Sequence, residues 1–264
     1  MTDHVPVLMY HSVTENPPSA TRSLSVRPSD LDWQLRYLRD NGFTGLTFTD
    51  MCTRTRKGRA LPERPIVLTF DDGYADTHEE ALPLLQEYGF PATVFVTTGW
   101  LRDAGPTAAG HPLDRTMVWS QVRELHDSGI EVAAHSHSHA QLDQLDDRSL
   151  REELSLSKRL LEERLGEPVP SIAYPYGYSS RRVRDAVMEA GYVQAAAVAN
   201  AASQPGRNVF AMPRLTVRRS TSPSTFARIV ACEQLHRVFA LDRALTNGYL
   251  VVRRTRYALR RAAR

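Results

Sequence analysis

Short apolar runs alternate along the chain with longer segments that carry their leucines at helical spacing. Each run is too short for an ordinary helix, so we interpret the runs as buried strands. The segments between them end at or next to a glycine, which is typical of a helix C-terminus. The predicted strands are residues 5–10, 43–46, 66–70, 92–96, 130–134, 171–174 and 192–198, and the predicted helices are residues 29–41, 76–88, 119–128, 148–165 and 180–190.

This alternation of strand and helix predicts the fold class. Strands that are connected through helices pair in parallel, and the helices then cover the outside of the sheet. Seven or eight such units favour a single-domain α/β fold, a distorted (β/α) barrel of about seven strands with helices outside. An open, doubly wound sheet is the alternative.

Length and charge distribution suggest one catalytic domain with a basic end. The 264 residues, 42% of them hydrophobic, are enough for one large core. We assign residues 1–240 to the catalytic domain and residues 241–264 to a basic C-terminal helix or tail, because positive charge concentrates in RRTRYALRRAAR from Arg253 onward. This tail is either a solvated terminal helix or a surface that rests on anionic lipid or a phosphorylated glycan carrier.

Charge, cysteine content and the N-terminal sequence disfavour several classes of protein. The net charge of +3 is too small to indicate a nucleic-acid partner, and no nucleic-acid-binding motif is recognisable. Cys52 and Cys232 lie far apart and indicate no disulfide framework. The chain shows neither the pattern of a signal peptide nor a stretch long enough to span a membrane. We therefore expect a cytoplasmic protein, with peripheral membrane contact through the basic tail as an open alternative.

Polar residues follow four of the predicted strands at the point where each strand ends. His11 follows the first strand, Asp71 the third, His135 the fifth and Tyr176 the sixth. In a (β/α) barrel the active site lies at the carboxyl ends of the strands. We therefore expect these residues to face one another.

Two adjacent carboxylates and a histidine cluster indicate a metal site. Asp71 and Asp72 directly follow an apolar strand, where two negative charges are costly unless a cation lies nearby; the alternative is a turn whose aspartate caps the next helix. In HSHSH, His135 and His139 fall on one side of a helical or looped segment, and His137 is the weakest candidate of the three. In a strand, all three would share a face. One aspartate with two histidines leaves an open coordination position, which is typical of a catalytic Zn²⁺ site.

Three motifs in this order resemble the polysaccharide deacetylases of carbohydrate esterase family 4, also called the NodB homology domain. They are TFDDG at residues 69–73, the H-S-x-x-H run at 135–139 and AYPYG at 173–177, and the resemblance covers roughly residues 5–217. The opening PVLMYH also resembles the branch with poly-N-acetylglucosamine deacetylases, in which a histidine near the N-terminus replaces one near the C-terminus. The resemblance implies an acetylated carbohydrate substrate and a divalent metal, Zn²⁺ first, with Co²⁺, Ni²⁺ or Mn²⁺ as alternatives.

The resemblance also implies roles for individual residues. It supplies two proton-transfer groups, three metal ligands and a loop that binds substrate and stabilises the oxyanion through a backbone N–H. Carried over, Asp71 is the general base and His11 the general acid, Asp72, His135 and His139 are the metal ligands, and Tyr176 with its neighbours Pro175 and Tyr174 forms the oxyanion and substrate-binding loop.

One position departs from the family pattern. Most members have an arginine just before the Pro-aromatic pair, whereas this chain has Ala173 and Tyr174. We suggest that Arg214 replaces it, because an arginine there could reach across the barrel to support Asp71. The alternative is an ordinary surface arginine.

The sequence is compatible with three functions. The leading one is hydrolysis of the acetyl group from an N-acetylated amino sugar in a glycan or glycoconjugate. The second is an O-acetyl glycan esterase, which would need less help from His11 because an alcohol leaves more readily than an amine. The third is a catalytically silent glycan-binding protein, which is disfavoured because the base, the acid and all three ligands are present.

Overall fold

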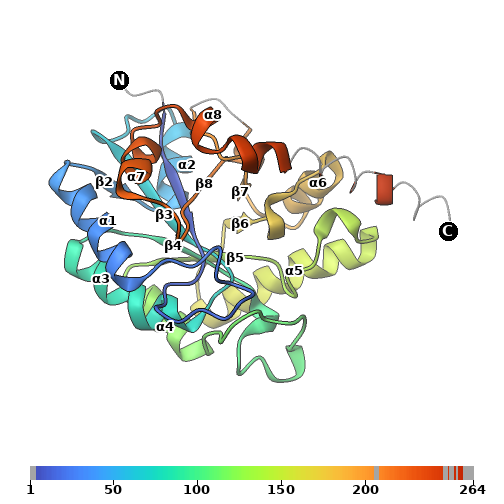
Figure 1. Cartoon of the computed structure of the whole chain (residues 1–264). Helices are drawn as coiled ribbons and strands as arrows, with labels where there is room; N and C mark the ends of the chain where they lie inside the picture. The colour runs from blue at the N-terminus through green and yellow to red at the C-terminus, as the bar shows by residue number, and fades with distance from the viewer. Residues whose placement is uncertain (1–3, 205–207, 246–248, 250–252, 254, 258–264) are drawn as a thin grey trace.

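A parallel β-sheet forms the centre of the molecule (Figure 1). The computed structural model describes residues 4–204, 208–245, 249, 253 and 255–257. The strands pair in the order β7-β6-β5-β4-β3-β1-β8, and β2 pairs with the first half of β3. They are β1 (Val7–Tyr10), β2 (Thr44–Leu46), β3 (Pro65–Phe70), β4 (Thr93–Val96), β5 (Glu131–Ala134), β6 (Ser171–Ala173), β7 (Gln194–Ala196) and β8 (Leu215–Thr216).

The two ends of this sheet meet. Met212 forms a parallel bridge with Ala196 of β7, and the N–H of Asn200 donates to the carbonyl of Arg214 at 3.0 Å. Leu215, the residue after Arg214, begins β8, and β8 pairs with β1. The distorted barrel predicted from the sequence is therefore confirmed, and an open sheet is excluded.

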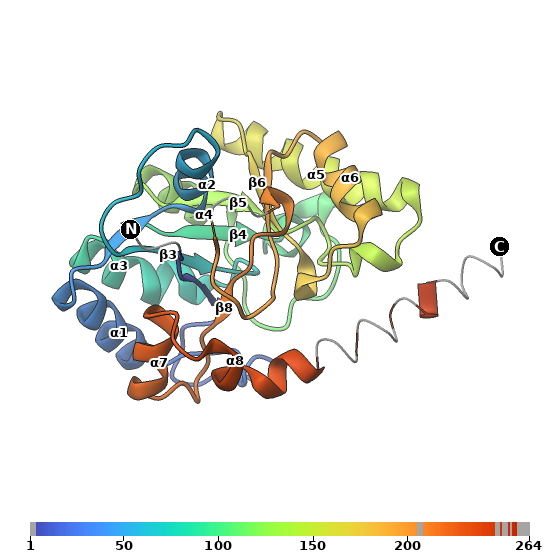
Figure 2. The same ribbon diagram turned by 90° about the horizontal axis from the view of Figure 1, so that it is seen from above.

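Helices cover the outside of the sheet, as Figures 1 and 2 show from two directions. The five helices predicted between the strands are present, and among the labelled helices of the described residues α2, α7 and α8 were not predicted. Helix α2 begins where the Thr47 hydroxyl accepts a hydrogen bond from the Asp50 N–H at 3.1 Å. The helices are α1 (Pro28–Asp40), α2 (Phe48–Arg56), α3 (Leu82–Tyr88), α4 (Trp119–Asp127), α5 (Asp147–Leu165), α6 (Arg181–Glu189), α7 (Pro223–Val230) and α8 (Leu235–Val238).

The predicted helix 76–88 is irregular at its start. Thr77–Ala81 forms a π-helical turn, in which the N–H of Leu82 donates to the carbonyl of Thr77. Pro83 follows immediately and has no N–H to donate. The wider turn changes the hydrogen-bond register just before the proline, and α3 continues regularly from there.

The interior of the barrel is lined by apolar side chains on the inward face of the strands, and those of β5, β6 and β7 are small. Ala133, Ala173 and Ala196 belong to this inner cluster, whereas the larger outer cluster fills the space between sheet and helices. The small side chains leave room for Arg214, whose guanidinium lies 5.3 Å from the ring centre of Phe95. Among the described residues, no helix combines the length and apolarity needed to cross a membrane.

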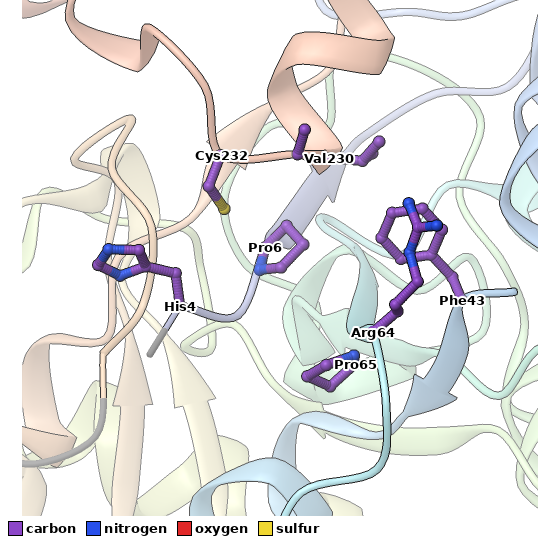
Figure 3. A pocket seen from close by; sticks show the side chains of 8 residues that line it. His4, Pro6, Phe43, Arg64, Pro65, Val230 and Cys232 are labelled. Atoms are coloured by element: carbon purple, nitrogen blue, oxygen red, sulfur yellow. The ribbon is translucent and has the colours of Figure 1, made fainter. Parts of the chain in front are cut away.

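A pocket of about 300 Å³ lies at the amino ends of the strands (Figure 3). Pro6 precedes β1, Phe43 precedes β2, and Pro65 begins β3, so these side chains stand at the end of the barrel opposite to the residues that follow the strands. Arg64 covers the ring of Phe43 at 4.4 Å. The lining is completed by His4, Val230, Ala231 and Cys232.

Asp76 is a largely buried carboxyl group beside the loop that follows β1. Burial raises its pKa from 3.8 to about 6, although the Ser12 hydroxyl, which donates to Oδ2 at 2.6 Å, partly offsets this. The folded state therefore holds a proton more tightly than the unfolded chain, and stability falls as pH rises from about 4 to 6. We expect Asp76→Asn, which cannot ionise, to be about 3 kcal/mol more stable than the parent at pH 7.5 and nearly equal to it at pH 4.

Urea unfolding at the two pH values measures this difference. Asp127→Asn, at an exposed position, is the matched control and should change stability at neither pH. An equal gain for Asp76→Asn at both pH values would assign the effect to packing instead of ionisation.

Candidate active site

Three potential metal ligands converge at the carboxyl ends of β3 and β5. The Nε2 atoms of His135 and His139 lie 3.4 and 3.3 Å from Oδ1 of Asp72, and the ligand atoms of all three residues lie within 4.8 Å of one another. Oδ1 of Asp72 is buried and has no hydrogen bond of normal geometry among the described residues. An anionic oxygen in that position is costly unless a cation is bound. One carboxylate oxygen and two imidazole nitrogens fit a divalent metal such as Zn²⁺.

A hydrogen bond of Nδ1 fixes the orientation of the His135 ring. Nδ1 lies 2.9 Å from the carbonyl oxygen of Ala173, the residue that ends β6. A carbonyl can only accept, so Nδ1 carries a proton, and Nε2 is the nitrogen that faces Asp72 and is left for a metal ion. This is the arrangement that orients a histidine ligand in metalloenzymes.

Four residues of the site have left-handed backbone conformations that side chains other than glycine rarely adopt. Their φ angles are 75° at Asp72, 61° at Ser136, 60° at His139 and 60° at Tyr176. Each such residue costs free energy that the surrounding contacts must offset. The backbone at the site is therefore held in place by the fold, which is typical of functional sites.

Aromatic rings pack against His139 from two other loops. The ring centres of Trp100 and Tyr176 lie 4.7 and 4.8 Å from that of His139. His137 is directed elsewhere, with its Nδ1 2.9 Å from the Thr98 hydroxyl, and it does not join the three ligands. Trp100 is not among the site residues predicted from the sequence; its only signal there is its position shortly after β4.

Asp71 and Arg214 form a buried ion pair inside the barrel. Nη1 of Arg214 lies 2.6 Å from Oδ1 of Asp71, and Nη2 lies 2.7 Å from Oδ2. Arg214 is fully buried and also donates to the Thr69 hydroxyl and the Ala197 carbonyl. Burial alone would raise the pKa of Asp71, but the guanidinium and nearby His135 lower it below its ordinary value. Asp71 is therefore ionised at neutral pH, and the arginine suggested from the sequence does reach it.

His11 follows β1 on the same side of the barrel. Its Nδ1 is buried without a hydrogen-bond partner among the described residues. Burial lowers its pKa, and the charges of Asp72 and Asp71 only partly oppose this effect. The imidazole is therefore mostly neutral at neutral pH, and it lies close enough to both carboxylates to interact with their charges.

The three residues expected in the substrate-binding loop differ in exposure. Tyr174 is fully buried and its hydroxyl donates to the Phe210 carbonyl at 2.8 Å, so its side chain belongs to the core. Pro175 is buried as well. Tyr176 leaves 52% of its surface exposed and is the member of this loop whose side chain a ligand can contact.

Part of the C-terminal segment packs beside this loop. Arg253 is buried, pairs with Asp143 and covers the ring of Tyr178 at 4.2 Å. Residues 258–264, which hold the end of the basic tail, lie outside the described residues. The tail's membrane contact, the cytoplasmic location and the division of the chain at residue 240 stay predictions.

Comparison with known proteins agrees with this geometry. The family model for polysaccharide deacetylase matches residues 58–195. YxkH from Bacillus subtilis, which is named for the same family, is 27% identical over 226 residues, covering 86% of this chain and 76% of the relative. Poly-beta-1,6-N-acetyl-D-glucosamine N-deacetylase from Escherichia coli K12 is 33% identical over 135 residues, which is 49% of this chain but only 20% of that protein.

Solved structures share the fold. A polysaccharide deacetylase from Bacillus cereus superposes with a TM-score of 0.74 at 28% identity, over 86% of this chain and 69% of that chain. A Streptococcus pyogenes deacetylase in complex with acetate gives a TM-score of 0.77 at 23% identity, over 86% of this chain and 98% of that chain. Since the family model covers more than half of the sequence, and since the barrel agrees with these structures, the chain belongs to the polysaccharide deacetylase family.

Proposed function

We propose that this protein is a metal-dependent hydrolase that removes the acetyl group from an N-acetylated amino sugar in a glycan or glycoconjugate. The observation that supports this most strongly is the ionised Asp71, which Arg214 holds by two hydrogen bonds directly beside the Asp72–His135–His139 cluster. A general base next to three ligands with an open coordination position is the arrangement needed for hydrolysis of an acyl group.

Asp71 acts as the general base in this proposal. Because Arg214 keeps it ionised, Asp71 can accept a proton from the water that attacks the acetyl carbonyl. Asp72, His135 and His139 would hold the divalent ion, for which we propose Zn²⁺, and the bound ion would supply Lewis-acid polarisation and charge stabilisation. The backbone N–H of Tyr176 is the proposed additional donor to the developing oxyanion.

His11 acts as the general acid. The amine of an amide is a poor leaving group until its nitrogen is protonated, so the reaction needs a proton donor as well as a base. Because the pKa of His11 is lowered in the free enzyme, the imidazole must first take up a proton from solvent, which it then donates to the leaving amine. The carboxylates of Asp71 and Asp72, whose charges favour the protonated ring, assist this step.

Relatives named as poly-beta-1,6-N-acetyl-D-glucosamine N-deacetylases indicate the substrate class. We propose a glycan with N-acetylglucosamine units, bound with a sugar ring against the exposed face of Tyr176. O-acetyl glycan hydrolysis is the second candidate, since the same base and metal ligands would serve it.

Acetate release from a panel of glycans tests the function. We expect the chelated protein to be inactive and to recover turnover on β-1,6-linked N-acetylglucosamine oligomers when Zn²⁺, Co²⁺, Ni²⁺ or Mn²⁺ is restored. Chitin oligomers and O-acetylated xylan complete the panel, and Asp72→Ala, treated in the same way, should stay inactive with every metal. Acetate release that survives chelation, or silence of the restored protein on every substrate, would contradict the proposal.

A further inference from the structure

The segment between the two histidine ligands makes a tight loop that its own sequence does not favour. Ser136 and His139 both have left-handed backbone conformations. Within the loop, the N–H of His139 donates to the Ser136 hydroxyl oxygen at 3.1 Å. Since two residues of this kind are costly, the loop keeps its shape only if outside contacts hold it.

One set of outside contacts comes from the turn Thr98–Trp100, which follows β4. The N–H of Gly99 donates to the carbonyl of His137 at 2.7 Å, and the Thr98 hydroxyl lies 2.9 Å from Nδ1 of the same histidine. A Cβ atom at position 99 would lie only 2.6 Å from that carbonyl oxygen. The close approach of these two loops therefore requires glycine at this position.

Glu153 of α5 holds the opposite side of the loop. Its Oε2 accepts the backbone N–H groups of His137 at 3.0 Å and Ser138 at 2.8 Å, and its Oε1 accepts the Ser138 hydroxyl. A carboxylate that accepts backbone N–H groups forms charge-assisted hydrogen bonds, which are stronger than neutral ones. Glu153 thereby satisfies two successive N–H groups immediately before His139.

We propose that Glu153 is a positioning residue for the metal site. It holds the loop so that His139 presents its nitrogen beside Asp72 and His135 before the ion arrives. Glu153 does not belong to the ligand cluster, and both of its oxygens are engaged by the loop. It therefore sets the affinity for a divalent cation without contacting the cation. The inference rests on the proposed metal site of the deacetylase.

Zinc affinity of the metal-free protein, measured by competition with a chromophoric chelator, tests this role without substrate. We expect Glu153→Ala to weaken Zn²⁺ binding by about 10- to 100-fold, the loss typical when an outer support of a metal ligand is removed. Glu153→Gln should stay within a few fold of the parent, because its amide oxygen can accept the two N–H groups while its NH₂ donates to the Ser138 hydroxyl. Glu152→Ala, at an exposed position paired with Arg148, is the matched control and should bind like the parent.

The outcomes separate this inference from the proposed function. Parent-like affinity in a folded Glu153→Ala protein overturns the role of Glu153 even if the parent is an active deacetylase. Weakened affinity in Glu153→Ala, with retention in Glu153→Gln, supports the role even if no tested glycan is hydrolysed. If Glu153→Ala does not fold, Ser138→Ala replaces it; this variant removes one of the three hydrogen bonds and should weaken Zn²⁺ binding by a smaller factor, whereas unchanged affinity counts against the proposal.

Discussion

Arg214→Met should lower the free energy of unfolding by about 3–5 kcal/mol and reduce deacetylation by at least 100-fold. Methionine leaves Asp71 buried without the two hydrogen bonds that Arg214 provides. An unpaired buried carboxylate is strongly disfavoured, so its pKa should rise and its orientation should become less defined. Both effects weaken the proposed general base. Urea unfolding and acetate release from N-acetylglucosamine oligomers measure the two quantities.

A double-mutant cycle separates the structural role of this pair from its chemical role. Asp71→Asn alone should also destabilise, because it leaves the Arg214 charge uncompensated, whereas the double variant with Arg214→Met should recover much of the lost stability and no activity. Arg228→Met, at an exposed position of α7, is the control and should change neither quantity. Simple addition of the two single losses in the double variant would show that the residues are not coupled, contrary to the geometry.

Sequence order could predict that the three proposed metal ligands lie together, but not every group that supports them. Asp72, His135 and His139 each follow an apolar strand, so the general rule for barrels was enough to bring them together. Arg214 lies 143 positions from Asp71. The pairing of Arg214 with Asp71 could be suggested only because this chain lacks the family's arginine before the Pro-aromatic pair. The contact itself depends on small side chains inside the barrel.

The groups that sequence analysis missed have local patterns with more ordinary explanations. Glu153 lies in a helix rich in glutamate and arginine, where charged residues usually form a solvated face. Its role depends on how α5 lies against the loop of HSHSH, which is tertiary information. Strand β8 has two residues, too few for any periodicity, and the barrel is closed by the bridge of Met212 to Ala196 and by the hydrogen bond from Asn200 to Arg214.

His11→Ala should reduce hydrolysis of N-acetylated substrates by about 100- to 10,000-fold, while hydrolysis of O-acetylated substrates should fall only a few fold. An amine leaves only after its nitrogen is protonated, whereas an alcohol needs much less assistance, so the difference between substrates measures the acid. His236→Ala, at an exposed position, is the control and should leave both rates unchanged. Equal losses on both substrates would mean that His11 supports the structure of the site and does not supply the proton.

The pH dependence of the parent enzyme gives a second measure of the same role. Burial lowers the pKa of His11, so the protonated fraction of this residue falls as pH rises through a value below 6.5. The lowered pKa of Asp71 keeps the base ionised across the same range. Turnover of the amide should therefore decline relative to turnover of the ester as pH increases, and His11→Ala should remove that divergence. In the proposed mechanism the acid is then the group that distinguishes an N-deacetylase from an esterase on this scaffold, since the proposed base and metal ligands would serve both reactions equally.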